Sequence, residues 1–140
     1  MGKTTDFLDK TLKDSKRLPD YNYIDDTAEE RAKISKDIQD KFQSINNFAK
    51  LHAMSASHLN EFLNGKKNVS RDHLLIIFIE LNYSEDTINS YLKRFGETPL
   101  YSRKKRDAII KIGLQNDLSL DEINAELERE GQDLLWIGKD

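Results

Sequence analysis

Hydroxyl, amide and basic side chains gather in one short part of the sequence, between residues 44 and 71. Such groups suit nucleic acids, because hydroxyls and amides hydrogen-bond to base edges and phosphates while lysine and arginine neutralise phosphates. Residues 41–73 carry five basic and two acidic side chains, a net charge of +3, whereas the whole chain has −3. This positive region is a possible contact surface for a polyanion, and chance clustering on a solvated helical surface is the alternative. The candidate contact residues are Ser44, Ser55, Ser57, His58, Asn60, Glu61, Lys66, Lys67 and Arg71.

Motifs of the common enzyme classes do not occur in the sequence. It has no cysteine, which excludes disulfides, thiolate zinc sites and cysteine catalysis. It also has no glycine-rich phosphate loop, no GxSxG and no HExxH. His52 and His58 have no carboxylate at ligand spacing, so we expect no metal site. We therefore expect a non-enzymatic protein that needs no cofactor.

The elements that must position the candidate residues are expected to be helices. Only 2 prolines and 6 glycines occur in 140 residues, too few for the many turns of an all-β protein. Thr27 and Glu30 have the spacing of a capping box at the start of a helix over 28–43. Residues 73–81 are apolar nearly all round, which predicts a helix at the centre of the core. We expect an all-α, compact helical bundle, with further helices over 45–52, 56–63, 85–95, 103–115 and 119–130.

The second half of the sequence contains an internal repeat. Residues 71–101 match residues 106–136 at no fewer than ten positions, which fall on expected helix caps and core positions. A looser third copy precedes them, so we expect three helix–turn–helix hairpins, near 45–65, 73–96 and 106–131. Each copy has a serine that is followed four and five positions later by an aliphatic residue and an asparagine. The asparagines Asn60, Asn89 and Asn124 either form a functional row or, as we favour, hydrogen-bond to neighbouring backbone groups.

The stretch SINNFAKLHAMSASHLNEFLNG, residues 44–65, resembles the DNA-binding core of lambda-repressor-like (Xre/Cro-type) regulators. In that family a Ser or Thr opens the second helix. A Leu-Ala pair, a small apolar turn, a Ser, the recognition helix and an Asn-Gly-basic exit follow. The resemblance covers about residues 28–82, and Phe48, Leu63 and Val69 depart from the usual family residues. The matching features are Ser44, Phe48-Ala49, Ala53-Met54, Ser55, residues 56–63 and Asn64-Gly65-Lys66-Lys67.

This resemblance implies a sequence-specific transcriptional regulator of the repressor or antitoxin type that binds double-stranded DNA. A helix–turn–helix lays its second helix in the major groove, so the helix over 55–63 would read bases. The residues implied at the base edges are Ser55, Ser57, His58, Asn60 and Glu61. Ser44, Lys66, Lys67 and Arg71 would contact the DNA from the flanks. The small number of phosphate contacts per subunit favours a homodimer on a two-fold operator.

We expect an N-terminal arm or short helix over 1–25, a lambda-repressor-like domain over 26–82 and an extension of helical hairpins over 83–140. The extension is acidic, and it favours the alternative of an all-helical protein-interaction module, an adaptor or inhibitor that does not bind DNA. It could also hold a protein partner of a DNA-binding chain. The basic run over 103–106 is either a second phosphate contact or, as we favour, a solvated helix start. Without a secretory signal or an apolar run that could span a bilayer, we expect no membrane partner and a cytoplasmic location.

Overall fold

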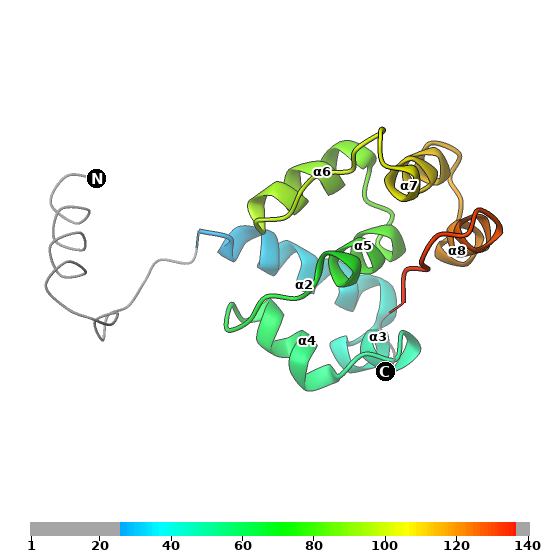
Figure 1. Cartoon of the computed structure of the whole chain (residues 1–140). Helices are drawn as coiled ribbons and strands as arrows, with labels where there is room; N and C mark the ends of the chain where they lie inside the picture. The colour runs from blue at the N-terminus through cyan, green and yellow to red at the C-terminus, as the bar shows by residue number, and fades with distance from the viewer. Residues whose placement is uncertain (1–25, 137–140) are drawn as a thin grey trace, which may run out of the picture.

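Helix α5 (Arg71–Glu80) lies in the middle of the structure (Figure 1). All its residues from Leu74 to Ile79 are buried, which confirms the prediction of a central apolar helix. The structure is a computed structural model that describes residues 26–136, so the expected arm over 1–25 lies outside the described residues. Within 26–136 the chain forms seven helices and no strand, which confirms the all-α bundle. The other helices are α2 (Ala28–Phe42), α3 (Ile45–Leu51), α4 (Ala56–Leu63), α6 (Glu85–Arg94), α7 (Lys105–Gln115) and α8 (Leu120–Arg129).

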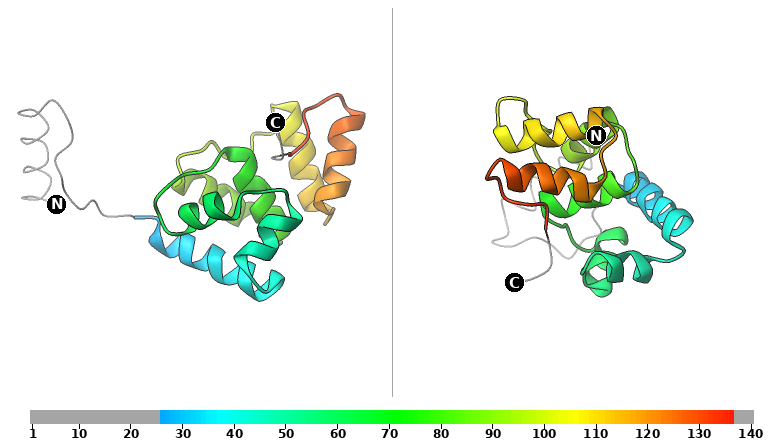
Figure 2. Two further views of the ribbon diagram at one scale, coloured as in Figure 1. Left: turned by 90° about the horizontal axis from the view of Figure 1, so that it is seen from below. Right: turned by 90° about the vertical axis from the view of Figure 1, so that its right-hand side faces the viewer.

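The remaining helices surround α5 on both sides. Helices α3 and α4 lie on one side of it and α7 lies on the other, as Figure 1 and the right-hand view of Figure 2 show. A single apolar core runs through these layers, and every helix contributes buried side chains to it. The core therefore continues from the first hairpin into the repeat region, with Ile34, Ile38, Phe48, Leu59, Phe62, Ile88, Leu92, Ile110, Ile123 and Leu127 among its members.

The start of α2 differs from the sequence prediction. The Thr27 side chain makes no capping hydrogen bond; its Oγ1 accepts a hydrogen bond from Arg31 Nε at 2.8 Å. Glu30 pairs with Arg94 of α6, with 2.9 Å between Oε2 and Nε. The predicted capping box is therefore wrong, because two arginines compete for the same side chains. A complete capping box does form elsewhere, at Ser119 and Glu122.

The turns of the three hairpins α3–α4, α5–α6 and α7–α8 have the same conformation, which confirms the looser third copy of the repeat. In each turn a residue with positive φ is followed by an apolar residue and then by the serine that caps the next helix. The amide of the apolar residue donates to the carbonyl five positions back, at 2.8–3.0 Å. Each second helix is followed by a glycine of positive φ, as expected of a left-handed helix end. The turn triplets are Ala53-Met54-Ser55, Asn82-Tyr83-Ser84 and Asp117-Leu118-Ser119.

Of the three turn residues with positive φ, Ala53, at 54°, has the highest conformational cost. A left-handed backbone costs a residue with a Cβ about 1–2 kcal/mol, whereas Asn and Asp tolerate it better. We expect Ala53→Gly to raise the free energy of unfolding by about 0.5 kcal/mol, because the relief exceeds the entropy that glycine adds to the unfolded chain. Urea denaturation measures this change. In the matched control, Asn82→Gly, no gain is expected, and an equal gain in both variants would contradict the assignment.

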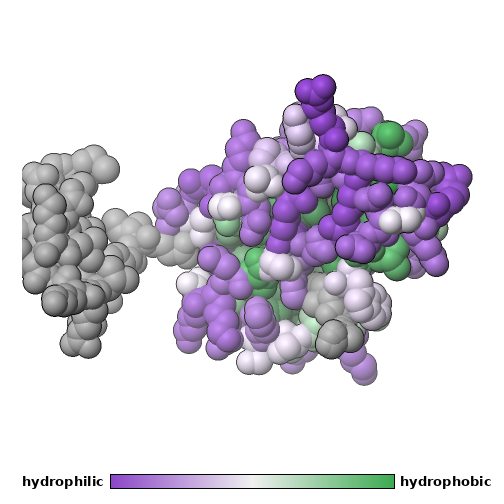
Figure 3. Space-filling view, in the orientation of Figure 1, coloured by the Kyte–Doolittle hydropathy of each residue, from purple (hydrophilic) through white to green (hydrophobic). Residues whose placement is uncertain are grey.

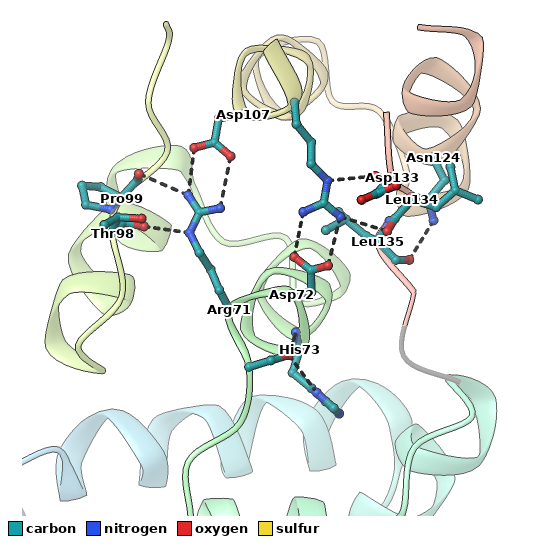
Figure 4. Close-up of polar contacts among 12 residues, drawn as sticks. Arg71, Asp72, His73, Thr98, Pro99, Asp107, Asn124, Asp133, Leu134 and Leu135 are labelled. Carbon is teal, nitrogen blue, oxygen red and sulfur yellow. Dashed lines mark hydrogen bonds and ion pairs between the residues drawn. The ribbon is translucent and has the colours of Figure 1, made fainter. Parts of the chain in front are cut away.

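The hairpins α5–α6 and α7–α8 exchange equivalent contacts (Figure 4). Arg71 of the first binds Asp107 of the second, with 2.9 Å from Nη2 to Oδ2, and Arg106 of the second binds Asp72 of the first, with 2.9 Å from Nη1 to Oδ1. Each arginine also donates to two carbonyls of its own unit, Thr98 and Pro99 in one case and Asp133 and Leu134 in the other. The repeat is thus a pair of units joined by reciprocal Arg–Asp bridges.

The three asparagines, which recur at the same position of each hairpin, have a structural role. The Oδ1 atoms of Asn89 and Asn124 each accept the amide of the leucine eleven residues later, Leu100 and Leu135, at 2.8 Å. Asn60 Nδ2 donates to the Ala56 carbonyl at 2.9 Å within α4. All three therefore hydrogen-bond to backbone, as predicted.

Candidate nucleic-acid interface

Helix α4 has one buried side and one outward side. Leu59 and Phe62 are buried, and the helix packs mainly on α2 and α3. The four residues on the opposite side follow the spacing i, i+3, i+4, i+7 of one helical face. Of these, Ser57 and Asn64 are exposed, and Asn60 and Glu61 are half-buried. We call Ser57, Asn60, Glu61 and Asn64 the outward face. The sequence prediction missed Asn64, which its position seven residues after Ser57 could have indicated.

The outward face lies at the edge of the molecule. In Figure 1, α4 is at the lower edge, on the side of α5 away from α7. The space-filling view in Figure 3 colours this edge mostly from purple to nearly white, so hydrophilic residues and residues of intermediate hydropathy form it. On the His58 side of α4, the exposed Trp136 lines a hollow together with Asn68 and His73.

Ser44 and Ser55 are both helix caps. Ser44 Oγ accepts the Asn47 amide of α3 at 3.0 Å, and Ser55 Oγ accepts the His58 amide of α4 at 3.1 Å. Both residues are exposed. Since a capping hydroxyl accepts a hydrogen bond, its own proton is still available to donate to a phosphate or a base.

His58 does not belong to the outward face. Its ring stacks on His73 of α5, with 5.9 Å between centroids and 9° between planes. Its Nε2 is buried and has no hydrogen-bond partner among the described residues. Position 58 lies next to the buried Leu59, and its ring is turned toward α5 and away from the outward face.

Arg71 is fully engaged inside the molecule, contrary to its expected role at a phosphate. Nη1 and Nη2 bind the two oxygens of Asp107 at 3.1 and 2.9 Å, while Nε and Nη2 also donate to the Thr98 and Pro99 carbonyls. With every guanidinium nitrogen used in this way, Arg71 joins the two hairpins rather than facing a ligand.

The exit from α4 carries the positive charge of the candidate interface. Gly65 has a φ of 83° and turns the chain away from the helix. Lys66 and Lys67, which follow it, are exposed. Lys67 Nζ lies 3.0 Å from Glu61 Oε1, which neutralises the single carboxylate of the outward face. Lys66 is therefore available to phosphates, whereas Lys67 shares its charge with Glu61 and makes that carboxylate less repulsive to phosphates.

Arg31 of α2, which the sequence prediction missed, holds this exit in place by hydrogen bonds. Its Nη1 donates to the carbonyls of Phe62 and Lys67, and its Nη2 donates to Asn68 Oδ1 at 3.0 Å. The guanidinium lies 4.8 Å from the Phe62 ring centroid, a cation–π contact. The buried position of Arg31 follows the core spacing of α2, three residues before Ile34 and seven before Ile38, and this spacing was the available signal.

His52 fixes the turn between α3 and α4 to α5. Its Nε2 pairs with Glu80 Oε2, and its Nδ1 lies 2.8 Å from the Phe48 carbonyl. Burial alone would lower the pKa of His52, but the hydrogen bonds to Glu80 and Phe48 raise it above its ordinary value of 6.5. The hydrogen bond from His52 also lowers the pKa of Glu80. The folded state therefore favours the charged pair.

This pair predicts a pH-dependent stability. Because the pKa of His52 is higher in the folded than in the unfolded chain, its contribution is complete below about pH 6.5 and is lost as the pH rises through the folded pKa. We expect the contribution of His52 to the free energy of unfolding to fall as the pH rises above about 6.5. Urea denaturation across this range measures the fall, and His52→Gln should reduce it. A fall of the same size in His52→Gln would assign the dependence to other groups.

The second helices of the three hairpins differ in charge. The first turn of α4 has no acidic residue, whereas that of α6 has Glu85 and Asp86 and that of α8 has Asp121 and Glu122. The exits differ in the same direction: Lys66-Lys67 follows Gly65, Glu97 follows Gly96, and Gln132-Asp133 follows Gly131. Only the first hairpin therefore combines a carboxylate-free helix start with a basic exit.

Comparisons with known proteins give no assignment. No protein-family model matches the chain, and no curated protein or solved structure matches it significantly. Within residues 26–136, no group of three or more histidine, aspartate or glutamate side chains is placed to hold a metal ion. Over the same residues no helix has the length and apolar character required to span a membrane. A function must therefore be inferred from the residues of this chain.

Proposed function

We propose that this chain is a non-enzymatic, lambda-repressor-like transcriptional regulator that binds specific sequences in double-stranded DNA. Helix α4 would enter the major groove, and Lys66 and Lys67 would contact the phosphates beside it. The observation that carries the proposal is the comparison of the three hairpins. Their connecting turns have the same conformation. Only in α3–α4 does the second helix begin without carboxylates and end in a basic exit.

The proposed complex is a homodimer on a two-fold operator. Among the described residues, the exposed cations around α4 include Lys36, which is paired with Asp40, and Lys50, Lys66 and Lys67, whereas Arg71 is engaged with Asp107. So few phosphate contacts support weak binding by a single subunit, and two subunits on related half-sites double them. Repression would follow if this binding blocks transcription from the operator.

Charge reversal at the exit tests the proposal. We expect Lys66→Glu combined with Lys67→Glu to weaken DNA binding about 10- to 100-fold for all sequences. The plot of log affinity against log salt should lose about two units of slope per subunit. Gel shifts with genomic fragments at several salt concentrations measure both effects.

The matched control makes the same change of net charge elsewhere. Lys93→Glu combined with Arg129→Glu alters two exposed cations near the ends of α6 and α8, and it should leave affinity nearly unchanged. If the unaltered protein retains no DNA at low salt, the proposal is wrong.

An acidic surface on α8 favours a second candidate, a protein-interaction module that acts as an adaptor or inhibitor. Asp121, Glu122, Glu128 and Glu130 are all exposed there, and DNA would avoid such a surface. The exposed Trp136 follows it in the chain, with 66% of its surface accessible. This candidate predicts a protein partner whose binding is insensitive to the reversal of Lys66 and Lys67, so the same variants distinguish the two functions.

A further inference from the structure

The outward face of α4 offers two carboxamides, a hydroxyl and the Glu61 carboxylate to a groove, and the cation beside it, Lys67 Nζ, lies 3.0 Å from that carboxylate. From Leu51 to Gly65 the chain contains neither lysine nor arginine. At eight residues α4 is about 12 Å long, close to the width of the major groove. The outward face begins in the first turn of α4 at Ser57 and extends about two helical turns, to the C-cap Asn64.

Guanine recognition depends on the residues that this face lacks. The commonest specific contact in the major groove is a bidentate one from arginine or lysine to the O6 and N7 atoms of guanine. Lys66 and Lys67 lie beyond Gly65, on the loop that leaves the helix, and Lys67 Nζ is already held 3.0 Å from Glu61 Oε1. No side chain of the outward face can make this contact.

Adenine recognition uses asparagine, and the outward face has two asparagines. An asparagine accepts from adenine N6 through Oδ1 and donates to N7 through Nδ2. Asn64 is exposed, and its side chain makes no hydrogen bond to any described residue. Asn60 uses one amide hydrogen on the Ala56 carbonyl at 2.9 Å, which leaves Oδ1 and the second hydrogen free. Both carboxamides can therefore meet an adenine.

The other two side chains of the face do not oppose this preference. A serine hydroxyl such as that of Ser57 pairs with several bases and discriminates little. A free carboxylate at Glu61 would accept from cytosine N4, but its Oε1 is already paired with Lys67 Nζ at 3.0 Å. Only the asparagines remain as strong discriminators.

We infer that the operator half-sites are A·T-rich where α4 enters, with adenines opposite Asn60 and Asn64. This inference rests on the proposed function and adds the class of base pair that the interface selects. It also states which residues set the preference, so that it can fail while DNA binding itself stands.

Selection of binding sites from random duplex DNA by the full chain, at one stated salt concentration, tests the inference. We expect each half-site to be enriched in adenine. We also expect a duplex made only of A·T pairs to compete at least about 10-fold better than one made only of G·C pairs. Retention of no duplex would overturn the proposed function. Retention of duplexes enriched in guanine would overturn this inference alone.

Two variants separate groove reading from a general preference for A·T-rich DNA. Asn60→Ala combined with Asn64→Ala should abolish the preference. If the preference persists in this variant, it does not come from α4 and the inference is wrong. Asn64→Arg places a guanidinium on the exposed end of the face, and it should replace one selected adenine by guanine. Selection that is unchanged by Asn64→Arg would equally overturn the inference.

Discussion

Replacing Asp107 by alanine is expected to lower the free energy of unfolding by about 3–5 kcal/mol. Asp107 is only 4% exposed, and its two oxygens bind Arg71 at 3.1 and 2.9 Å and the Tyr101 amide at 2.9 Å. Alanine leaves a largely buried guanidinium and an amide without their acceptor. Urea denaturation followed by circular dichroism measures the loss.

The repeat supplies a matched control for this prediction. Asp72 makes the equivalent bridge to Arg106, but its side chain is 32% exposed against 5% for Asp107. Water can therefore replace much of what Asp72 provides, and Asp72→Ala is expected to cost about 1 kcal/mol. Equal losses in the two variants would show that burial does not set the strength of these bridges.

The repeated local features were accessible from the sequence because they depend on near neighbours. Ser55, Ser84 and Ser119 cap their helices, as the shared spacing predicted. Each cap needs only the amide three residues later, so a local pattern is sufficient to specify it. The central helix was equally predictable, because a helix that is apolar on all sides, such as residues 73–81, is stable only when it is buried in the core.

The features that were missed or misplaced depend on partners far along the chain. Arg71 was read as a phosphate contact because it ends a basic region, yet its carboxylate partner lies 36 residues later. Its recurrence as Arg106, beside Asp72 and Asp107, was the available clue to paired bridges. His58 was misplaced for a different reason. One helical position rotates a side chain by about 100°, and the inward rotation became clear only once His73 was placed opposite.

Arg31 shows how a buried cation can serve a surface that it never reaches. Its guanidinium ties the end of α4, through the Phe62 carbonyl, to the loop that carries Lys66 and Lys67, through the Lys67 carbonyl and Asn68. The ring of Phe95 lies on it as well, 5.2 Å from the guanidinium carbon. The interface therefore depends on a charge placed in α2, in the first element of the described chain.

Replacing Arg31 by methionine is the second change with a large expected effect. Methionine keeps much of the apolar volume but leaves two carbonyls and the Asn68 oxygen without their donor, so we expect a loss of about 2–4 kcal/mol in the free energy of unfolding. Thermal and urea denaturation measure it. DNA affinity should also fall at temperatures where the variant is fully folded, because the loop no longer holds the lysines beside α4.

Arg94→Met is the control, because Arg94 also contacts α2 but lies at the surface, and its hydrogen bonds go to Glu30 and Asp26 rather than to the α4 exit. We expect it to lower stability less than Arg31→Met does and to leave DNA affinity unchanged. The decisive result is the affinity of folded Arg31→Met. If it equals that of the unaltered chain, the exit holds its shape without Arg31, and this arginine stabilises the core without positioning the interface.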